Sequence, residues 1–566
     1  MSDKHFDVIV IGSGFGGSVS AYRFAEAGRR VCLLERGKAY PPGSFPRSPY
    51  EMKHNFWDPS QGLHGMYNVW SFRNLGAVVS SGLGGGSLIY ANVLIRKDER
   101  WFVNEKPDRP GYEAWPITRA DLEPHYDNVE RVLAPQRYPV AHAPYAQTPK
   151  LAAMRVAAEA LSARAQPGQV EFLLPNLAVT FGNPGAPPVP GEPIIEEFPN
   201  LHGRTRDTCR LCGECDIGCN YGSKNTLDYN YLTRAQRAHA DIRTRCEVRS
   251  FKPLGGDGYE VSYVEHSTGM TDTKALPLHT ISCDKLVLAA GAIGSTFMLL
   301  KNRANFPNLS PRLGHAINGN GDILGLVLHS HDQATGEGRV TEPSQGPVIT
   351  SALRFADQLD GVGAHGRGFY VEDAGYPQFV NWLVQSADIS GTAARFAGFL
   401  WTWIKMHVVA NPTSDLGQAL SGLLGSGSFT RSALPLLGMG RDVPTGIASL
   451  NAAGLLALDW DIAPSKDYFN RVRDAMHEIA DALQAKYADD PLWLLSQELT
   501  VHPLGGCPMG ESREEGVVDS YGQVFGYPGF YIVDGSVLPG PVGPNPALTI
   551  AACADRFTEH AIDRGT

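Results

Sequence analysis

Positive charge is in short supply in this sequence. Lys and Arg total 49 against 59 Asp and Glu, which gives a formal net charge of −10. No basic cluster stands out along the chain, and attraction to nucleic acid requires one. We therefore expect no nucleic-acid partner.

The sequence also has no long apolar run, and we expect no export leader. The most apolar stretch, residues 396–404, lies between Arg395 and Lys405 and is too short to span a bilayer. Met1 leads almost directly into an apolar strand, without the basic and apolar segments of a secretory signal. We expect a cytoplasmic protein, with peripheral contact to a membrane left open.

Cysteine is scarce and odd in number, at nine residues in 566. This argues against a disulfide framework in a cytoplasmic protein. Glycine is abundant instead, at 62 residues, which suggests many tight turns and close backbone approaches.

Three segments at the start of the chain predict a βαβ unit. Residues 6–11 and 31–34 are β-branched, apolar strands, and residues 18–27 between them form a helix. Two further buried strands are expected at 285–291 and 530–535. Because these strands lie at both ends and in the middle, we expect an α/β nucleotide-binding domain assembled from separated segments.

A G-x-G-x-x-G pattern joins the first strand to its helix. Gly12 permits the tight turn, Gly14 lets the backbone approach a pyrophosphate, and Gly17 lets the helix pack on the strand. Glu35 ends the second strand, where a carboxylate accepts from ribose hydroxyls and disfavours NADP. These residues leave FAD and NAD both open, and further glycine clusters at 82–87 and 289–292 favour the larger cofactor.

Several blocks of the sequence resemble the glucose–methanol–choline (GMC) oxidoreductases, and within them the cholesterol-oxidase-like branch. The blocks are residues 12–17, 34–37, 82–92, 288–295, 501–507, 533–536 and 543–550. They bracket nearly the whole chain, although residues from about 311 to 460 match nothing recognisable.

The resemblance implies two discontinuous domains. The first is a Rossmann-like FAD-binding domain, and the second is a substrate-binding domain built on a mixed or antiparallel sheet. We expect the FAD domain at 1–130, 204–310 and 490–566, and the substrate domain at 131–203 and 311–489, with an apolar insert at about 380–440. That insert is either a lid admitting a lipid-like substrate or ordinary core.

The resemblance also implies which residues contact FAD. They are Gly12, Gly14, Phe15, Gly16, Gly17, Glu35, Arg36, Gly82, Gly86, Ser87, Asn92, Val248, Ala290, Gly291, Asp534, Gly535, Asn545 and Pro546. Pro546 opens a helix whose positive end suits the negative charge of a reduced flavin.

His502 and Asn545 are the predicted catalytic pair. Oxidising an alcohol by hydride transfer requires its hydroxyl proton to leave, and a histidine is suited to accept it. Asn545 can donate to the developing alkoxide. Relatives of the cholesterol-oxidase type also use a carboxylate, for which Glu372 and Asp373 are candidates only because they are acidic.

Four cysteines form a run with the spacing C-x₂-C-x₂-C-x₃-C, namely Cys209, Cys212, Cys215 and Cys219. The spacing matches a bacterial ferredoxin and predicts an iron–sulfur cluster of the 4Fe–4S or 3Fe–4S type. Asn220 replaces the usual proline and no second run exists, so a fourth ligand from elsewhere, such as Cys246, is an alternative. Unligated thiols and zinc are the other interpretations.

We therefore expect an FAD-dependent oxidoreductase that acts on a small apolar alcohol, sterol- or terpenoid-like. Its electrons would leave through the cluster to an acceptor protein or quinone. The alternatives are an oxidase that uses O₂ without a cluster, a lyase or isomerase that retains flavin, and an electron-transfer module without a substrate.

Overall fold

The structure is a computed structural model that describes most of the chain. It covers residues 4–564 apart from 49–50, 53, 106–110, 256, 268–270, 333, 377–432 and 490–497. The apolar insert predicted at about 380–440 lies outside the described residues, except for its last eight positions.

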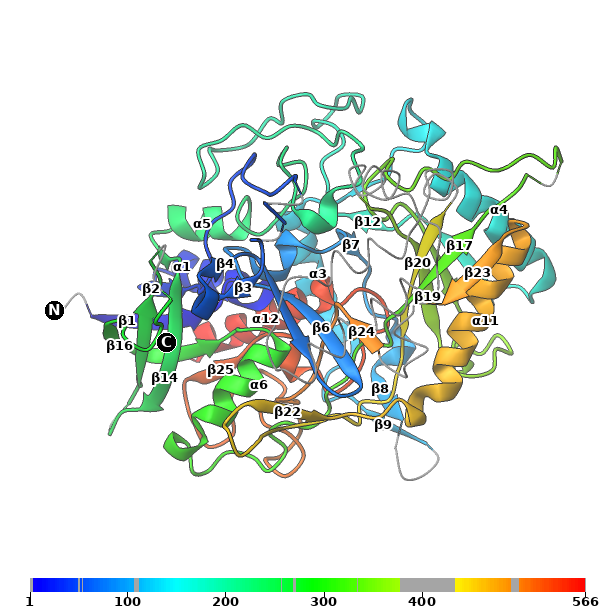
Figure 1. The fold of residues 1–566 in the computed structure, drawn as a ribbon. Helices are drawn as coiled ribbons and strands as arrows, with labels where there is room; N and C mark the ends of the chain where they lie inside the picture. Colours follow the sequence, from blue (N-terminus) through cyan, green and yellow to red (C-terminus); the bar gives the residue numbers. More distant parts are fainter. Residues whose placement is uncertain are drawn as a thin grey trace.

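The first of two large sheets carries the N-terminal strand (Figure 1). Its strand order is β13 (Asp241–Arg243), β2 (Val31–Leu34), β1 (His5–Ile11), β16 (Leu278–Leu288), β15 (Tyr259–Glu265) and β14 (Cys246–Pro253), and β25 (Phe530–Ile532) also pairs with β16. The pairs β13–β2, β2–β1, β1–β16 and β16–β25 are parallel. Strands from three distant parts of the sequence therefore form one parallel core.

Helices cover this parallel core. They are α1 (Phe15–Glu26), α3 (Arg119–Leu133), α5 (Tyr231–Arg237) and α12 (Ala547–Asp563), which pack on one another, while α6 (Ala292–Lys301) follows β16. Because β1 and β2 are buried on both faces, their sequences are apolar runs without alternation. α3 begins at a capping box in which Thr118 and Asp121 satisfy each other's backbone N–H groups.

The second large sheet is antiparallel at every pair (Figure 1). Its order is β11 (Val170–Leu173), β18 (Ala352–Phe355), β19 (Phe369–Asp373), β20 (Leu434–Gly440), β17 (Ile323–Leu328) and β23 (Lys486–Asp489). Helices α4 (Pro149–Arg164) and α11 (Lys466–Ala482) pack against each other and against this sheet. Phe369 and Val371 of β19 join the core beneath those helices. Since strand side chains alternate, Tyr370 and Glu372 face the opposite way.

The remaining strands form smaller sheets. β24 (Glu498–Thr500), β6 (Leu75–Ser80) and β5 (Tyr67–Ser71) form one small sheet, and β10 (Gln136–Arg137), β12 (Asn176–Leu177) and β7 (Val93–Leu94) form another. Two-stranded ladders join β3 (Trp57–Asp58) to β4 (Leu63–His64), β8 (Val103–Glu105) to β9 (Tyr112–Ala114), and β21 (Ile447–Leu450) to β22 (Leu456–Asp459).

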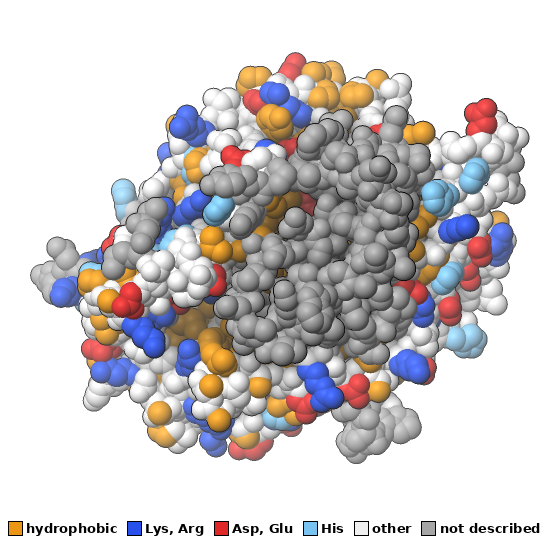
Figure 2. Space-filling view, viewed as in Figure 1, with side chains coloured by type: hydrophobic (Ala, Val, Ile, Leu, Met, Phe, Trp, Pro, Cys, Tyr) orange, Lys and Arg blue, Asp and Glu red, His pale blue; other side chains and the backbone are white. Residues whose placement is uncertain are grey.

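Charges of both signs are mixed on the surface. Figure 2 shows basic side chains interspersed with acidic ones over the described part of one face. Among the described residues, no helix has both the length and the apolar composition needed to cross a membrane.

Candidate active site

The glycine turn after β1 has two kinds of glycine. A β-carbon on Gly12, Gly16 or Gly17 would lie 2.3 Å or less from a backbone oxygen, so these three are required for the close packing of α1. A β-carbon on Gly14 would meet no protein atom within 4 Å. Gly14 also caps α1 without a side-chain hydrogen bond. The first turn of α1, which includes Phe15, therefore offers backbone N–H groups to an anion.

Glu35 is fixed at the end of β2, beside that turn. Its Oε2 accepts hydrogen bonds from the backbone N–H of Ser13 (3.0 Å) and from the Ser13 hydroxyl (2.6 Å), and its Oε1 accepts from Gly37 (2.8 Å). Arg36 turns away, with its guanidinium 5.2 Å from the ring centre of Trp57. Both carboxylate oxygens of Glu35 retain lone pairs for further donors.

The second glycine segment lies against the first. A β-carbon on Gly85 would fall 2.5 Å from the Gly14 Cα. A β-carbon added to Gly86 or Gly291, in contrast, would meet no protein atom within 4 Å. Ser87 uses its hydroxyl within the loop, donating to the Gly84 carbonyl at 2.7 Å. The structure thus brings the predicted glycine turns together around open space.

Asn92 is a buried amide that adopts a positive φ of 71°. Its side chain contacts the Cys215 thiol, and neither its Oδ1 nor its Nδ2 makes a hydrogen bond of normal geometry to a described residue. The amide therefore has hydrogen-bonding capacity left for a polar group that binds here.

Asp534 joins the carboxyl ends of β16 and β25. Its Oδ2 accepts from the backbone of Gly291 (2.8 Å) and the hydroxyl of Ser295 (2.5 Å), and its Oδ1 accepts from the backbone of Ser536 (2.9 Å). The other predicted cofactor residues are Gly82 in the glycine loop, Val248 in β14, Ala290 after β16, Gly535 at the next turn and Pro546 before α12.

His502 contacts a carboxylate that the sequence did not indicate. Its Nδ1 lies 2.8 Å from Oδ1 of Asp322, whose Oδ2 accepts from the backbone N–H of Val501 at 2.9 Å. Asp322 is buried at the start of β17, whereas the His502 side chain is 15% exposed. The imidazole is therefore anchored through Nδ1, and its side chain remains partly exposed.

Asn545, just before α12, contacts Glu372 of β19. Its Nδ2 donates to Glu372 Oε2 at 3.3 Å, while Asn545 Oδ1 and Glu372 Oε1 have no partner among the described residues. Burial raises the pKa of Glu372 to about 8, so its carboxyl is protonated at neutral pH. Asp373 faces away and accepts from Thr350. Of the two acidic candidates, Glu372 is the one beside Asn545.

One short segment, residues 318–322, fixes the positions of both predicted catalytic residues, and no sequence pattern had indicated this role. Asn320 accepts from the backbone of Val542 (2.8 Å) and Gly543 (3.0 Å), which fixes the loop before Asn545. Asp322, two residues later, fixes His502. The alternating Asn and Gly residues from 318 to 321 indicate a turn in the sequence, but they say nothing of the two partners.

The four cysteines of the run line a single cavity, together with Lys224, Gly346 and other residues. All four are free thiols, and burial raises the pKa of Cys209, Cys212 and Cys215. Lys224 donates to the carbonyls of Cys215 (2.6 Å) and Leu88 (3.1 Å). The cavity thus adjoins the glycine loop that lies on the Gly14 turn.

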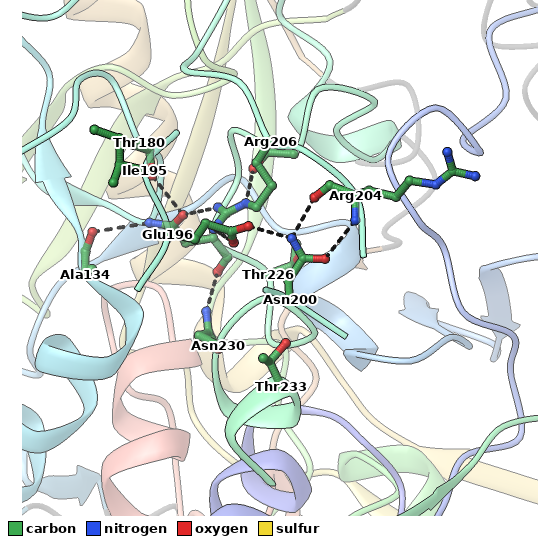
Figure 3. Close-up of polar contacts among 12 residues, drawn as sticks. Ala134, Thr180, Ile195, Glu196, Asn200, Arg204, Arg206, Thr226, Asn230 and Thr233 are labelled. Carbon is green, nitrogen blue, oxygen red and sulfur yellow. Dashed lines mark hydrogen bonds and ion pairs between the residues drawn. The ribbon is translucent and has the colours of Figure 1, made fainter. Parts of the chain in front are cut away.

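A polar network fixes the base of the cysteine loop (Figure 3). Arg206 precedes the run and donates to the carbonyl of Gly222 beyond it at 2.7 Å. The same guanidinium contacts Asn225 (2.5 Å) and Glu196 (3.3 Å), and Glu196 accepts from Asn200 at 2.7 Å. The two ends of the loop are therefore tied together by the protein itself.

The described residues around the cysteine run do not form a preformed site for a single metal ion. Among the described residues, no group of three or more His, Cys, Asp or Glu is placed to hold a metal ion. Zinc requires all its ligands around one point, so the zinc alternative finds no preformed site. Cys246 lies in β14, where its backbone binds Glu35, and it does not line the cavity.

Comparisons with known proteins agree with the nucleotide-type architecture. A family described as GMC oxidoreductase matches residues 447–554, and one described as FAD binding domain matches residues 7–40. The chain is 28% identical to a cholesterol oxidase from Mycobacterium tuberculosis, over 97% of this chain and 90% of that protein. It is 26% identical to a 2-methyl-1,2-propanediol dehydrogenase from Mycolicibacterium austroafricanum, over 98% and 94%. A fungal aryl-alcohol oxidase structure is 14% identical with a TM-score of 0.57 over both full chains, a likeness of fold.

The chain is similar to the GMC oxidoreductases, whose family matches its residues 447–554. It is an FAD-dependent oxidoreductase, and the predicted family resemblance and α/β fold class are both confirmed. The open space in front of Gly14, Gly86 and Gly291, and the remaining hydrogen-bonding capacity of the Asn92 amide, fit a bound flavin nucleotide.

Proposed function

We propose that the protein oxidises the CH–OH group of an apolar, sterol- or terpenoid-like alcohol. The observation that carries the proposal is the buried contact of Asn545 with Glu372, close to the segment that anchors His502. FAD, when bound, supplies the acceptor for the hydride from the alcohol carbon. The residues expected to hold it are the glycine turns, Glu35 and Asn92.

His502 is proposed to take the hydroxyl proton of the alcohol at Nε2, since Nδ1 is occupied by Asp322. Asn545 would donate its second amide N–H to the developing alkoxide. Glu372 is protonated at neutral pH because burial raises its pKa to about 8, so it acts there as a hydrogen-bond donor. It becomes a base only above that pH.

An apolar substrate is supported by similarity and by burial. The chain resembles a cholesterol oxidase over nearly its whole length. Asn545 is 6% exposed and Glu372 is fully buried, so a substrate that reaches them must leave water. An apolar alcohol loses the least on that transfer.

We further propose that the cysteine run holds an iron–sulfur cluster that passes electrons to an external acceptor, either a protein or a quinone. Each cysteine of a cluster binds a different iron, so its ligands surround a cavity and need not meet at one point. Four cysteines lining one cavity support this arrangement. So does the link through Lys224 to the loop beside the expected flavin site.

Anaerobic titration of the purified flavoprotein with sterols, terpenoid alcohols and sugars tests the main proposal. An apolar alcohol should bleach the flavin absorbance, and His502→Ala should retain FAD but slow bleaching on the order of 10²-fold or more. A flavin that stays oxidised while the substrate is converted would indicate a lyase or isomerase. Bleaching by sugars alone would contradict the substrate class.

A further inference from the structure

The contact between His502 and Asp322 has the geometry of a positioning pair. The two groups lie 180 residues apart in sequence and 2.8 Å apart in space. Oδ2 of Asp322 is taken by donors, namely Val501 N–H at 2.9 Å and the Thr500 hydroxyl at the same distance. A carboxylate so surrounded has no proton to give, so the hydrogen between it and His502 is carried on Nδ1.

We propose that Asp322 is the positioning residue of His502, holding the Nδ1–H tautomer so that Nε2 is free to accept the alcohol proton. The inference rests on the proposed function for the identity of the proton donor. The proton leaves the alcohol oxygen and forms an N–H bond at Nε2, and the resulting imidazolium is stabilised by the adjacent carboxylate.

Two more carboxyl groups lie behind Asp322, and burial favours the uncharged form of each. A β-carbon on Gly319 would lie 1.9 Å from Glu498 Oε1, and the Gly319 N–H donates to Asp442 Oδ2 at 3.2 Å. Burial raises the pKa of Asp442 to about 7 and that of Glu498 well above its usual range, with Asp322 adding to both shifts. Burial and the nearby Asp322 thus both disfavour a negative charge on Asp442 and Glu498.

Few other charges face the cluster from the elements around it. Tyr468 of α11 donates to the Gly321 carbonyl at 2.9 Å, Arg367 acts on Asp442, and Glu372 lies within electrostatic reach of Asp322. Among these described groups, Arg367 is the permanent cation, and its side chain donates to the carbonyls of Arg441 and Pro464. His502 is thus the direct hydrogen-bonding counter-group of the Asp322 carboxylate.

Replacement of Asp322 by asparagine tests the proposal, because an amide can also donate and so permits the other tautomer. In D322N, FAD content and the alcohol dissociation constant should be unchanged, while the limiting rate of flavin reduction falls on the order of 10²-fold or more. Diethyl pyrocarbonate acylates an unprotonated imidazole nitrogen. Its reaction with His502, followed by mass spectrometry, should slow on the order of tenfold.

D555N is the matched control. Asp555 makes the same kind of buried contact with His125, at 2.7 Å, between α12 and α3. This variant loses a His–Asp pair outside the site, so reduction and His502 acylation should both stay at the parental rate. Parental rates in D322N as well would overturn the proposal.

A measurement on the parent protein removes dependence on the folding of D322N. In protein labelled with ¹⁵N-histidine, the imidazole signals that disappear in H502Q should report the Nδ1-protonated tautomer. The Nε2-protonated tautomer would overturn the proposal. Acylation and tautomer need no substrate, so if both are as expected and no alcohol reduces the flavin, the positioning role stands and the proposed substrate class fails.

Discussion

Glu372 should make the stability of the protein fall as pH rises. Its pKa is about 8 in the folded protein against 4.5 when it is free in water, because burial penalises the charged form. Between these values the unfolded chain has released its proton while the folded chain retains it. The folded state binds more protons, so its stability is lost as pH rises through this window.

The size of the effect follows from the width of the window. Each pH unit contributes about 1.4 kcal/mol, so the whole window amounts to roughly 5 kcal/mol for this one group. The substitution Glu372→Gln removes the ionisable carboxyl group and keeps the shape of the side chain. Relative to the parent, we expect the stability of E372Q to increase by about 3.5 kcal/mol between pH 5 and pH 8. For a chain of this length that difference corresponds to about 3 °C in Tm.

Differential scanning calorimetry of the FAD-loaded parent and variant at pH 5, 6, 7 and 8 measures this directly. The difference between the two melting temperatures should widen steadily with pH. Glu171, which is exposed on β11, offers the control E171Q, whose melting temperature should follow the parent at each pH. If E372Q and the parent keep a constant difference from pH 5 to pH 8, the folded state does not hold Glu372 protonated and the reasoning fails.

Three further outcomes are expected. Gly14→Val should fold but elute from gel filtration without flavin absorbance, because the valine side chain fills the open space before α1. The control Gly255→Val, at another glycine without close neighbours, should keep its flavin absorbance. Asn545→Ala should keep FAD and slow anaerobic flavin reduction on the order of 10²-fold; an unchanged rate in stopped flow would remove Asn545 from the chemistry. Cys212→Ser should contain no iron or acid-labile sulfide after anaerobic purification, while the control Cys246→Ser, outside the cavity, should contain both. Equal iron contents in the two variants would contradict the proposal that the run binds a cluster.

The parts of the fold predicted from sequence are those with local patterns. The apolar strands around Gly12 and the glycine spacing identify the βαβ unit within forty residues, because each element depends on its neighbours in the chain. The antiparallel sheet was expected only from the resemblance. Its strands β17, β19 and β20 pair over long sequence separations, which no local pattern specifies.

The site divides in the same way. His502 and Asn545 stand in motifs that the family resemblance identifies, although their roles stay predictions. Glu372 could be distinguished from Asp373 only by the side of β19 on which each lies, which requires the strand register. Asp322 could not be found from sequence, because its partner is 180 residues away and an aspartate before an apolar strand is unremarkable.

The parallel sheet has a consequence for biosynthesis. β25 and Asp534, which complete the sheet and fasten the turn after β16, are made long after that turn, since Asp534 lies 243 residues beyond Gly291. The nascent chain therefore carries β1 and its glycine turn long before the nucleotide cradle can close. We expect flavin to be retained only after residues 530–534 have been added, so a chain interrupted before residue 530 should accumulate without colour and be open to proteolysis.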